Sequence, residues 1–285
     1  MSQTEFADTA LVLLGHGTTR DENSSAPVFQ HAAALRDRRL FAEVHEAFWK
    51  QPPQIQEVLA SPRTRRVLIV PLFMSEGYFS EEAIPRALGF ATEGPAESAR
   101  VRHRDNQILV YCRPVGTHPA LTRVVAARAA EVIQQAPFPR APATADTTLF
   151  AAGHGTEQSE NSRLAIDRHV EILRQERAYA AVHAVFLDEE PRIAACFQLA
   201  QTRNIVMVPC FVSDGLHVRQ DIPVLLGEPA RLVQQRLQAG QPTWRNPTEK
   251  QGKLVWLSRS VGSESGLAEL ILERASEGAA WVKCP

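Results

Sequence analysis

The chain lacks several features that would assign it to a class of protein. No apolar run approaches the roughly 18 residues of a transmembrane helix, and the first residues contain neither the basic nor the apolar segment of a secretory signal. The formal net charge is only −1, which gives no overall attraction to nucleic acid or to an acidic membrane. We therefore expect a cytoplasmic protein whose partners include no nucleic acid and no membrane.

Cysteines and phosphate-binding loops are also scarce or absent. The 4 cysteines, Cys112, Cys196, Cys210 and Cys284, form no CxxC pair and no close-spaced zinc pattern, so they indicate reduced thiols. Neither a GxGxxG nor a GxxxxGK[ST] loop occurs, and we expect no organic cofactor.

What the chain does contain is an internal repeat. The motif GHGT occurs twice, and His154 follows His16 by 138 positions (154 − 16). The same offset relates further pairs without a gap: residues 23–24 and 161–162, 70–71 and 208–209, and 84–85 and 222–223. The match is too long for chance, and on a prior of about 150 residues per domain a chain of 285 residues suggests two domains. The sequence therefore predicts a tandem duplication.

Each copy is predicted to alternate strands and helices. In the second copy the strands fall at 148–152, 181–187, 204–211 and 253–257, and the helices at 161–176, at 191–200, after 221–223 and at 266–275. Near-continuous apolar strands between helices are typical of a parallel sheet covered on both faces. We therefore predict an α/β fold of two tandem Rossmann-like domains, each with a mainly four-stranded parallel sheet flanked by helices. The predicted limits are an N-terminal repeat at 1–136, a proline-rich linker at 137–147 and a C-terminal repeat at 148–285.

Candidate metal ligands gather at the strand ends of the second copy. His154 follows its first strand, His217 its third, and Asp188 and Glu189 its second. The carboxyl ends of parallel strands form the edge at which an α/β sheet binds its ligands. Two imidazoles and a carboxylate are a donor set for a divalent first-row metal with open coordination positions. The alternative is that both histidines cap strands and that the acids only solvate a loop.

The first copy has a different set of residues at the same positions. It keeps His16 where the second copy has His154, but Phe79 stands at the position of His217 and Lys50 at that of Asp188. A phenyl ring and an ammonium group cannot bind a cation in this way. We therefore predict that the metal site of the first copy is degenerate.

The other histidines need separate interpretations. His31 and His45 recur in the second copy as His169 and His183, so their presence in both copies favours structural roles. His118 lies on a loop after the fourth strand of the first copy. It is a candidate for lining the binding site, with a structural role as the alternative.

These motifs resemble those of the class II chelatases of the CbiX/SirB type, which insert a divalent metal into sirohydrochlorin on the way to cobalamin or siroheme. The resemblance rests on GHGT after the first strand, on PCFVSDGLHVRQDIP at 209–223 and on PVGTHP at 114–119, and it covers nearly the whole chain as two copies. It implies a lyase that binds an anionic tetrapyrrole, sirohydrochlorin, in a cleft between two lobes. It also implies Co²⁺ or Fe²⁺ as the substrate metal, and a monomer, because single-copy relatives dimerise to make that cleft.

The resemblance also implies roles for particular residues. The metal histidines of the family fall on His154 and His217, and its acidic position falls on Asp188, with Glu189 beside it. His16 matches the first histidine in the other copy, where it would face the substrate. The candidates for binding the substrate's carboxylates are Arg163, Arg219, Arg20 and His118. The sequence departs from many two-copy relatives by carrying the complete pair in the second copy and a shorter acid, which leaves the metal and its third ligand open.

Two other functions are compatible with parts of the sequence. Histidine phosphatases carry an RHG motif after the first strand, but Gly15 and Gly153 replace that arginine here and remove the phosphate clamp. The second alternative is a non-catalytic carrier of a tetrapyrrole or a metal on a chelatase scaffold. The intact histidine pair in one copy counts against it.

Overall fold

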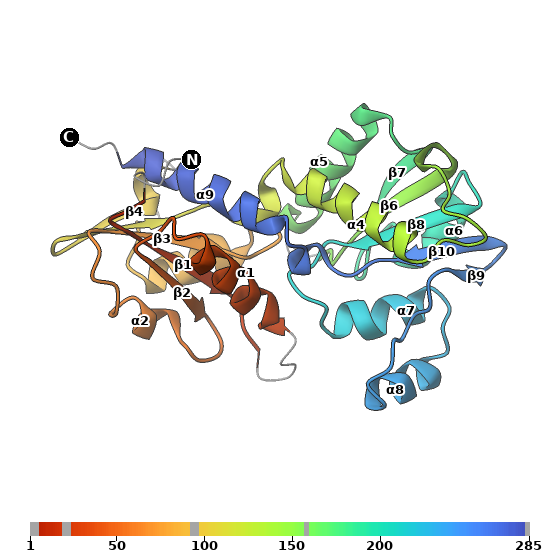
Figure 1. Cartoon of the computed structure of the whole chain (residues 1–285), viewed down its shortest axis with the longest axis horizontal. Helices are drawn as coiled ribbons and strands as arrows, with labels where there is room; N and C mark the ends of the chain where they lie inside the picture. The colour runs from red at the N-terminus through yellow and green to blue at the C-terminus, as the bar shows by residue number, and fades with distance from the viewer. Residues whose placement is uncertain (1–5, 19–23, 92–96, 157–159, 283–285) are drawn as a thin grey trace. The chain divides into compact units, whose positions relative to one another are not determined.

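A computed structural model of the chain describes residues 6–18, 24–91, 97–156 and 160–282. The chain forms two compact units, one made of Met1–His118 with Ser265–Pro285 and the other of Pro119–Glu264. Each unit is built on a five-stranded sheet flanked by helices (Figure 1). The predicted α/β fold with two tandem sheets is confirmed.

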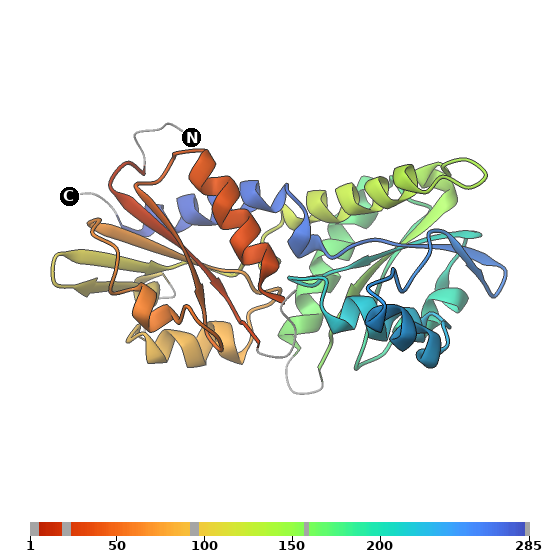
Figure 2. The ribbon, with the colours of Figure 1, turned by 60° about the horizontal axis from the view of Figure 1, so that its bottom comes forward.

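The sheet of the first unit has the strand order β2-β1-β3-β5-β4. Its strands are β1 (Thr9–Gly15), β2 (Glu43–Phe48), β3 (Arg66–Pro71), β4 (Val101–Arg104) and β5 (Gln107–Tyr111). Its helices are α1 (Ala26–Asp37), α2 (Ile55–Val58), the π-helix η2 (Phe79–Ala83), α3 (Ile84–Ala87), the 3₁₀ turns η3 (Ser98–Arg100) and η4 (Val115–Thr117), and α9 (Leu267–Trp281). Helices α1 and α9 cover one face of this sheet, and α2 and α3 pack on the other (Figure 2).

The second unit repeats this plan with the strand order β7-β6-β8-β10-β9. Its strands are β6 (Thr147–Gly153), β7 (Ala181–Phe186), β8 (Asn204–Pro209), β9 (Thr248–Lys250) and β10 (Lys253–Leu257). Its helices are α4 (Leu121–Gln135), η5 (Thr144–Asp146), α5 (Asn161–Glu176), η6 (Ile193–Ala195), α6 (Cys196–Leu199), the π-helix η7 (His217–Asp221), α7 (Ile222–Leu225), α8 (Ala230–Gln238) and η8 (Val261–Ser263). Strand β6 pairs in parallel with both β7 and β8, so their carboxyl ends meet at one edge.

The fifth strand of each sheet is the feature that the sequence pattern missed. Strands β4 and β9 each run antiparallel to their neighbour, β5 or β10, at the edge of the sheet. Their sequences, VRHR and TEK, are short and polar. Edge strands are often short and charged because this blocks pairing with other chains, and such strands carry no apolar run to reveal them. The predicted third helix also differs, because the segment after β8 folds into three short helices, η7, α7 and α8.

The last helix of each repeat packs in the unit of the other repeat. Helix α4 follows β5 in the chain but contacts β8, β10 and α5, whereas α9 contacts α1, β3 and β5. Two buried arginines hold these helices: Arg274 donates from Nε to the carbonyl O of Pro114 (3.0 Å), and Arg128 donates from Nε to that of Ser260 (3.1 Å). The repeat limits predicted from the sequence thus differ from the compact units, because an apolar helix face does not specify which sheet it covers.

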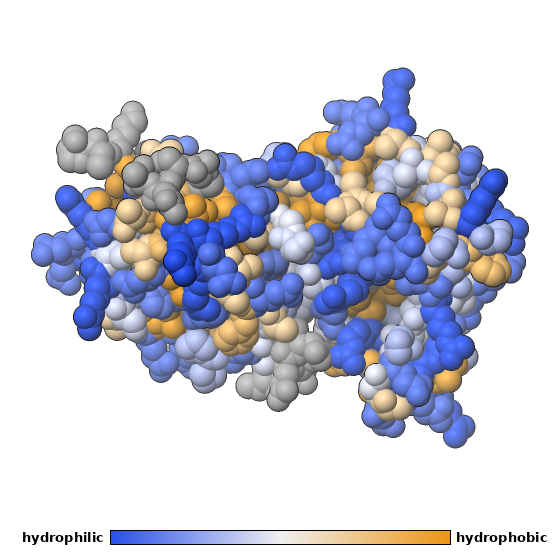
Figure 3. All heavy atoms as spheres, in the orientation of Figure 1, coloured by the Kyte–Doolittle hydropathy of each residue, from blue (hydrophilic) through white to orange (hydrophobic). Residues whose placement is uncertain are grey.

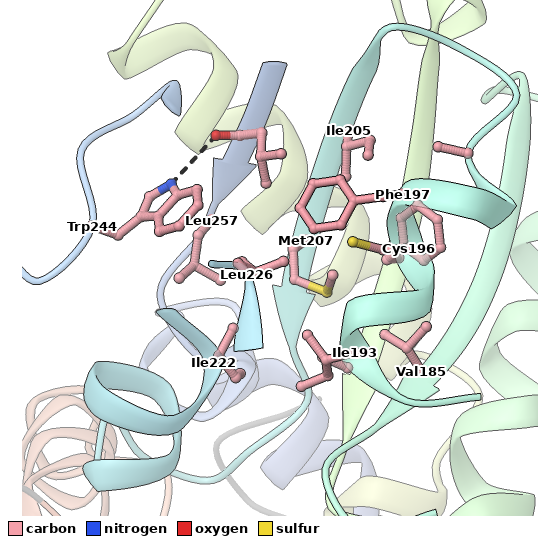
Figure 4. Packing of buried hydrophobic residues seen from close by; sticks show 14 of the residues in the cluster. Val185, Ile193, Cys196, Phe197, Ile205, Met207, Ile222, Leu226, Trp244 and Leu257 are labelled. Carbon is pink, nitrogen blue, oxygen red and sulfur yellow. Dashed lines mark hydrogen bonds between the residues drawn. The ribbon is translucent and has the colours of Figure 1, made fainter. Parts of the chain in front are cut away.

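The core of the second unit fixes the segment that carries His217. Met207 on β8 packs with Phe197 of α6 and with Ile222, the residue that directly follows η7 (Figure 4). Trp244 belongs to the same cluster and donates from Nε1 to the carbonyl O of Val255 (3.3 Å). Burying an isoleucine side chain stabilises a fold by about 1.5–3 kcal/mol. Ile222 therefore anchors the end of the π-helix to the sheet.

The described cysteines are buried free thiols. Burial raises the pKa of Cys112, Cys196 and Cys210 to about 12 each. A thiol with such a pKa stays protonated, which makes it a poor nucleophile and a poor metal ligand. This agrees with the prediction of reduced thiols, and Cys284 lies outside the described residues.

The described residues contain no helix that is both long and apolar enough to cross a membrane. The face drawn in Figure 3 is mainly hydrophilic, with hydrophobic residues in scattered patches.

Candidate metal centre

Two histidines meet at the carboxyl edge of the second sheet. His154 comes directly after β6, and His217 is the first residue of η7, which follows the neighbouring strand β8. Their ring centroids lie 5.0 Å apart and the ring planes are nearly perpendicular, at 86°. Short π-helices are rare and occur frequently at functional sites. The structure brings the two predicted ligands together, and their binding of a metal stays a prediction.

Hydrogen bonds fix the protonated nitrogen of each ring. The Nδ1 of His154 lies 2.8 Å from the carbonyl O of Gly155, and that of His217 lies 2.7 Å from Oδ2 of Asp221. A carbonyl or carboxylate oxygen can only accept, so Nδ1 carries the proton in both rings. This leaves the lone pair on Nε2 of each imidazole, which is the arrangement that metal-binding histidines adopt.

The two acidic candidates have different surroundings. Asp188 is exposed, and its Oδ2 lies 3.3 Å from Nδ1 of His154, away from Nε2. This position favours an orienting role over direct coordination. Glu189 folds over Gly155, where a Cβ would come within 2.6 Å of its Cγ, and Gly155 has a φ of +70°, so only glycine fits there. Oε1 of Glu189 is buried and has no hydrogen-bond partner in the described part of the chain.

Within residues 6–18, 24–91, 97–156 and 160–282, no three histidine, cysteine or acidic side chains converge on a single point that would hold a metal ion. The candidate centre thus consists of the two imidazoles of His154 and His217. A pocket of about 390 Å³ opens beside His217 and is lined in part by Asp188, Gln220 and Asp221. An ion held by few protein ligands can still accept donors from a second molecule.

The first unit reproduces this geometry with different chemistry. His16 follows β1 and Phe79 opens η2, and their ring centroids lie 5.0 Å apart at 78°. Nδ1 of His16 likewise donates to a carbonyl O, that of Gly17 (2.9 Å). Lys50 places its Nζ 5.7 Å from the centre of the Phe79 ring. One imidazole, one phenyl ring and one ammonium group do not form a cation site.

The predicted carboxylate-binding residues occupy several different environments. Arg163 stacks on the Phe186 ring and donates from Nη1 to the carbonyl O of Glu190 (2.8 Å), so it is partly engaged within the fold. Arg219 lies on η7, two residues after His217, and forms no ion pair in the described part of the chain. Arg20 lies outside the described residues. Of the two described arginines, Arg219 has the position that better fits a substrate contact.

His118 is buried against helix α9. Its Nε2 lies 3.3 Å from Oε1 of Glu277 and 3.5 Å from Oε2 of Glu273. Burial and the nearby guanidinium of Arg274 lower the pKa of His118, against the pull of both glutamates. This environment favours a structural link to α9 over the predicted substrate contact.

Asp221 is the residue that sequence reasoning left out of the site. Its carboxylate orients His217 from the next turn of η7. The signal for it was present, because the first copy has Ala83 at this position and also lacks the histidine. An acid that appears together with a histidine in the same copy is a candidate partner for that histidine.

The fold and the paired histidines place the chain in the class of chelatase-like α/β proteins. The crystal structure of DR2241 from Deinococcus radiodurans, a multi-domain protein with structural similarity to chelatases, superimposes with a TM-score of 0.76 at 28% identity, covering 95% of this chain and 55% of that one. This chain thus spans about half the length of that protein. SirB from Bacillus subtilis, solved with Fe³⁺, has a TM-score of 0.66 at 16% identity over 96% of both chains, which shows a shared fold.

The CbiX family model matches the chain twice, over residues 10–132 and 148–278, and the chain belongs to this family. A curated relative from Halobacterium salinarum, named probable sirohydrochlorin cobaltochelatase, is 37% identical over 283 residues, covering 96% of this chain and 92% of the relative. The resemblance inferred from the two GHGT motifs is therefore confirmed, and so is its two-copy form.

Proposed function

We propose that this protein is a sirohydrochlorin chelatase, a lyase that inserts a divalent cation into the macrocycle. The observation that carries the proposal is the pair of imidazoles of His154 and His217, 5.0 Å apart, each with Nδ1 held by a hydrogen bond and Nε2 open. The name of the 37% identical relative supports the same reaction.

The proposed chemistry follows from what the cation and the macrocycle each require. A divalent cation would bind Nε2 of His154 and of His217, leaving positions at which pyrrole nitrogens replace water. Two protons leave the macrocycle as the cation enters. Each imidazole that gives up the cation regains a basic Nε2 and accepts a proton there. The Asp221 carboxylate at Nδ1 stabilises the imidazolium of His217, and the buried Oε1 of Glu189, beside Gly155, is a second candidate proton acceptor.

Within this proposal the physiological cation is Co²⁺, which leads toward cobalamin, with Fe²⁺ and siroheme as the alternative. Nitrogen and oxygen donors bind both ions, and their relative affinity is set mostly by the metal. The name of the curated relative favours cobalt. A cytoplasmic location, expected from the sequence, stays a prediction.

An anaerobic assay with metal-free sirohydrochlorin tests the proposal. Co²⁺ and Fe²⁺ are supplied side by side, and the absorbance change on insertion is followed with and without protein, because metals also insert spontaneously. We expect multiple turnovers with Co²⁺, and only the spontaneous rate with a His154→Ala, His217→Ala double variant. A protein that binds the macrocycle and the cation but never exceeds the spontaneous rate is a carrier, and this result would overturn the proposal.

A further inference from the structure

The first unit carries a group of exposed rings that the metal chemistry does not use. We define the aromatic platform as His16, Tyr78 and Phe79, with Lys50 at its edge. We propose that this platform binds the flat face of the tetrapyrrole, and that Lys50 pairs with a carboxylate on the macrocycle's rim. The inference rests on the proposed function, since it names the binding residues for that substrate.

The rings form a fixed, solvent-facing surface. The ring centroid of Phe79 lies 5.0 Å from that of His16 and 5.5 Å from that of Tyr78, with the ring planes inclined at 78° and 66°. One of these rings can therefore stack on a flat ligand while its neighbours meet the same face edge-on. The ring centroid of Phe73 lies 6.3 Å from that of His16. Tyr78 is 60% exposed and Phe79 is 39% exposed. Large rings exposed together in this way mark binding surfaces, because leaving them in water costs free energy that a ligand recovers.

The fold does not require these rings. The core cluster of the first unit contains Ile84 and Leu88 from the same segment, but neither Tyr78 nor Phe79 belongs to it. The second unit adopts the same π-helix with Leu216 and His217 at these two positions. Because the duplicated backbone tolerates other side chains, the rings serve a purpose other than folding.

Charge selects the kind of ligand. Nζ of Lys50 lies 5.7 Å from the Phe79 ring and 5.6 Å from the Trp49 ring, and Lys50 forms no ion pair with any described residue. The ammonium group excludes a cation from this surface and attracts an anion. A flat aromatic molecule with carboxylates at its edge satisfies both the rings and the lysine. Sirohydrochlorin has both features. Phosphate has the negative charge but no flat aromatic face, and a metal ion has neither.

Binding of a metal-free macrocycle to the full-length protein tests the platform directly. Uroporphyrin III, a stable macrocycle with acetate and propionate groups, serves as the first probe and sirohydrochlorin as the second, with dissociation constants taken from absorbance titrations. A Tyr78→Ser, Phe79→Leu double variant keeps apolar bulk at position 79 but removes both aromatic rings. We expect its macrocycle Kd to rise about 10-fold or more. Co²⁺ binding, measured by calorimetry, should stay within about twofold of wild type.

Matched variants show whether a change in macrocycle Kd is specific to the residues of the aromatic platform. Phe138→Ser removes another exposed ring, in the segment between the repeats, and should leave the macrocycle Kd unchanged. Phe79→Tyr keeps the ring and should bind normally. Lys50→Gln should weaken binding and reduce its salt dependence, whereas Lys50→Arg should preserve both.

The outcomes distinguish this inference from the proposed function. A macrocycle Kd in the double variant within about twofold of wild type overturns the platform, even if the protein is an active chelatase. The platform is also overturned if the double variant instead abolishes self-association of the protein, because the rings then serve a protein interface. If the wild type binds the macrocycle through these rings but inserts no metal, the proposed function fails and the platform stands.

Discussion

The carboxylate of Asp221 lies 2.7 Å from Nδ1 of His217, four residues along the same π-helix. This contact sets the tautomer and the direction of the ring. His154 achieves the same result with the main-chain carbonyl of Gly155. The two rings are therefore oriented by different groups: His217 by the Asp221 carboxylate, and His154 by a main-chain carbonyl with the Asp188 carboxylate 3.3 Å from the same nitrogen.

Replacing Asp221 should weaken Co²⁺ binding without removing a proposed ligand. Loss of a group that orients a metal-binding histidine typically costs about 10–100-fold in affinity, and we expect this range for Asp221→Ala. The Co²⁺ affinity of Asp221→Asn should lie between that of Asp221→Ala and that of wild type, because an amide oxygen still accepts from Nδ1 but carries no charge. Calorimetry with Co²⁺ measures the effect, with Asp37→Ala, an exposed aspartate on α1, as the control. An unchanged Kd in Asp221→Ala would show that this carboxylate has no part in metal binding.

Removing either histidine of the pair should have a larger effect. His154→Ala and His217→Ala each delete one of the two proposed imidazole ligands, so the loss of Co²⁺ affinity should exceed the roughly 10–100-fold of an orienting group. Chelation should fall to the spontaneous rate in both variants. Both histidines are well exposed, at 46% and 50% of their side chains, and the circular dichroism spectrum should therefore not change. His103→Ala, an exposed histidine on β4, should behave as wild type; near-normal turnover in either site variant contradicts the assignment.

The sequence predicted the features that depend on local patterns. The limits of α5 and β10 agree with the predicted ranges 161–176 and 253–257, because apolar periodicity is a strong local signal. The meeting of His154 with His217 followed from the rule that neighbouring parallel strands end at one edge. The hydrogen-bond partners of His118 could not be predicted, since they depend on α9 packing beside the loop at 114–119, and no local pattern specifies that packing.

The buried position of His118 predicts a pH-dependent contribution to stability. Its pKa in the folded protein lies below the ordinary value of 6.5, first because of burial and then because of Arg274, with Glu273 and Glu277 opposing. The unfolded chain therefore binds more protons as the pH falls below about 6.5, and stability is lost from there down through the lower folded pKa. Urea unfolding midpoints should fall between about pH 7.5 and pH 5.

A substitution isolates the contribution of His118 from that of other groups. His118→Gln removes the titrating ring, so its midpoint should fall less than that of wild type over the same interval. His103→Gln, at an exposed site, should not reduce the wild-type pH dependence. An equal fall in wild type and His118→Gln would mean that other groups carry the acid sensitivity.

The duplication itself predicts one strong Co²⁺ site per chain. Phe79 and Lys50 stand where the second unit has His217 and Asp188, so the first unit should bind no cation strongly. Phe79→His alone should not create a second site, because the ammonium of Lys50 would repel the ion by up to about 3 kcal/mol per unit charge at roughly 6 Å and an effective dielectric of 20. Phe79→His combined with Lys50→Asp and Ala83→Asp supplies the acids of the second unit as well, and this triple variant should bind a second equivalent. The number of Co²⁺ ions bound per chain is measured by calorimetry. Two equal sites in the wild type, or two in the Phe79→His single variant, would show that Lys50 does not prevent cation binding in the first unit.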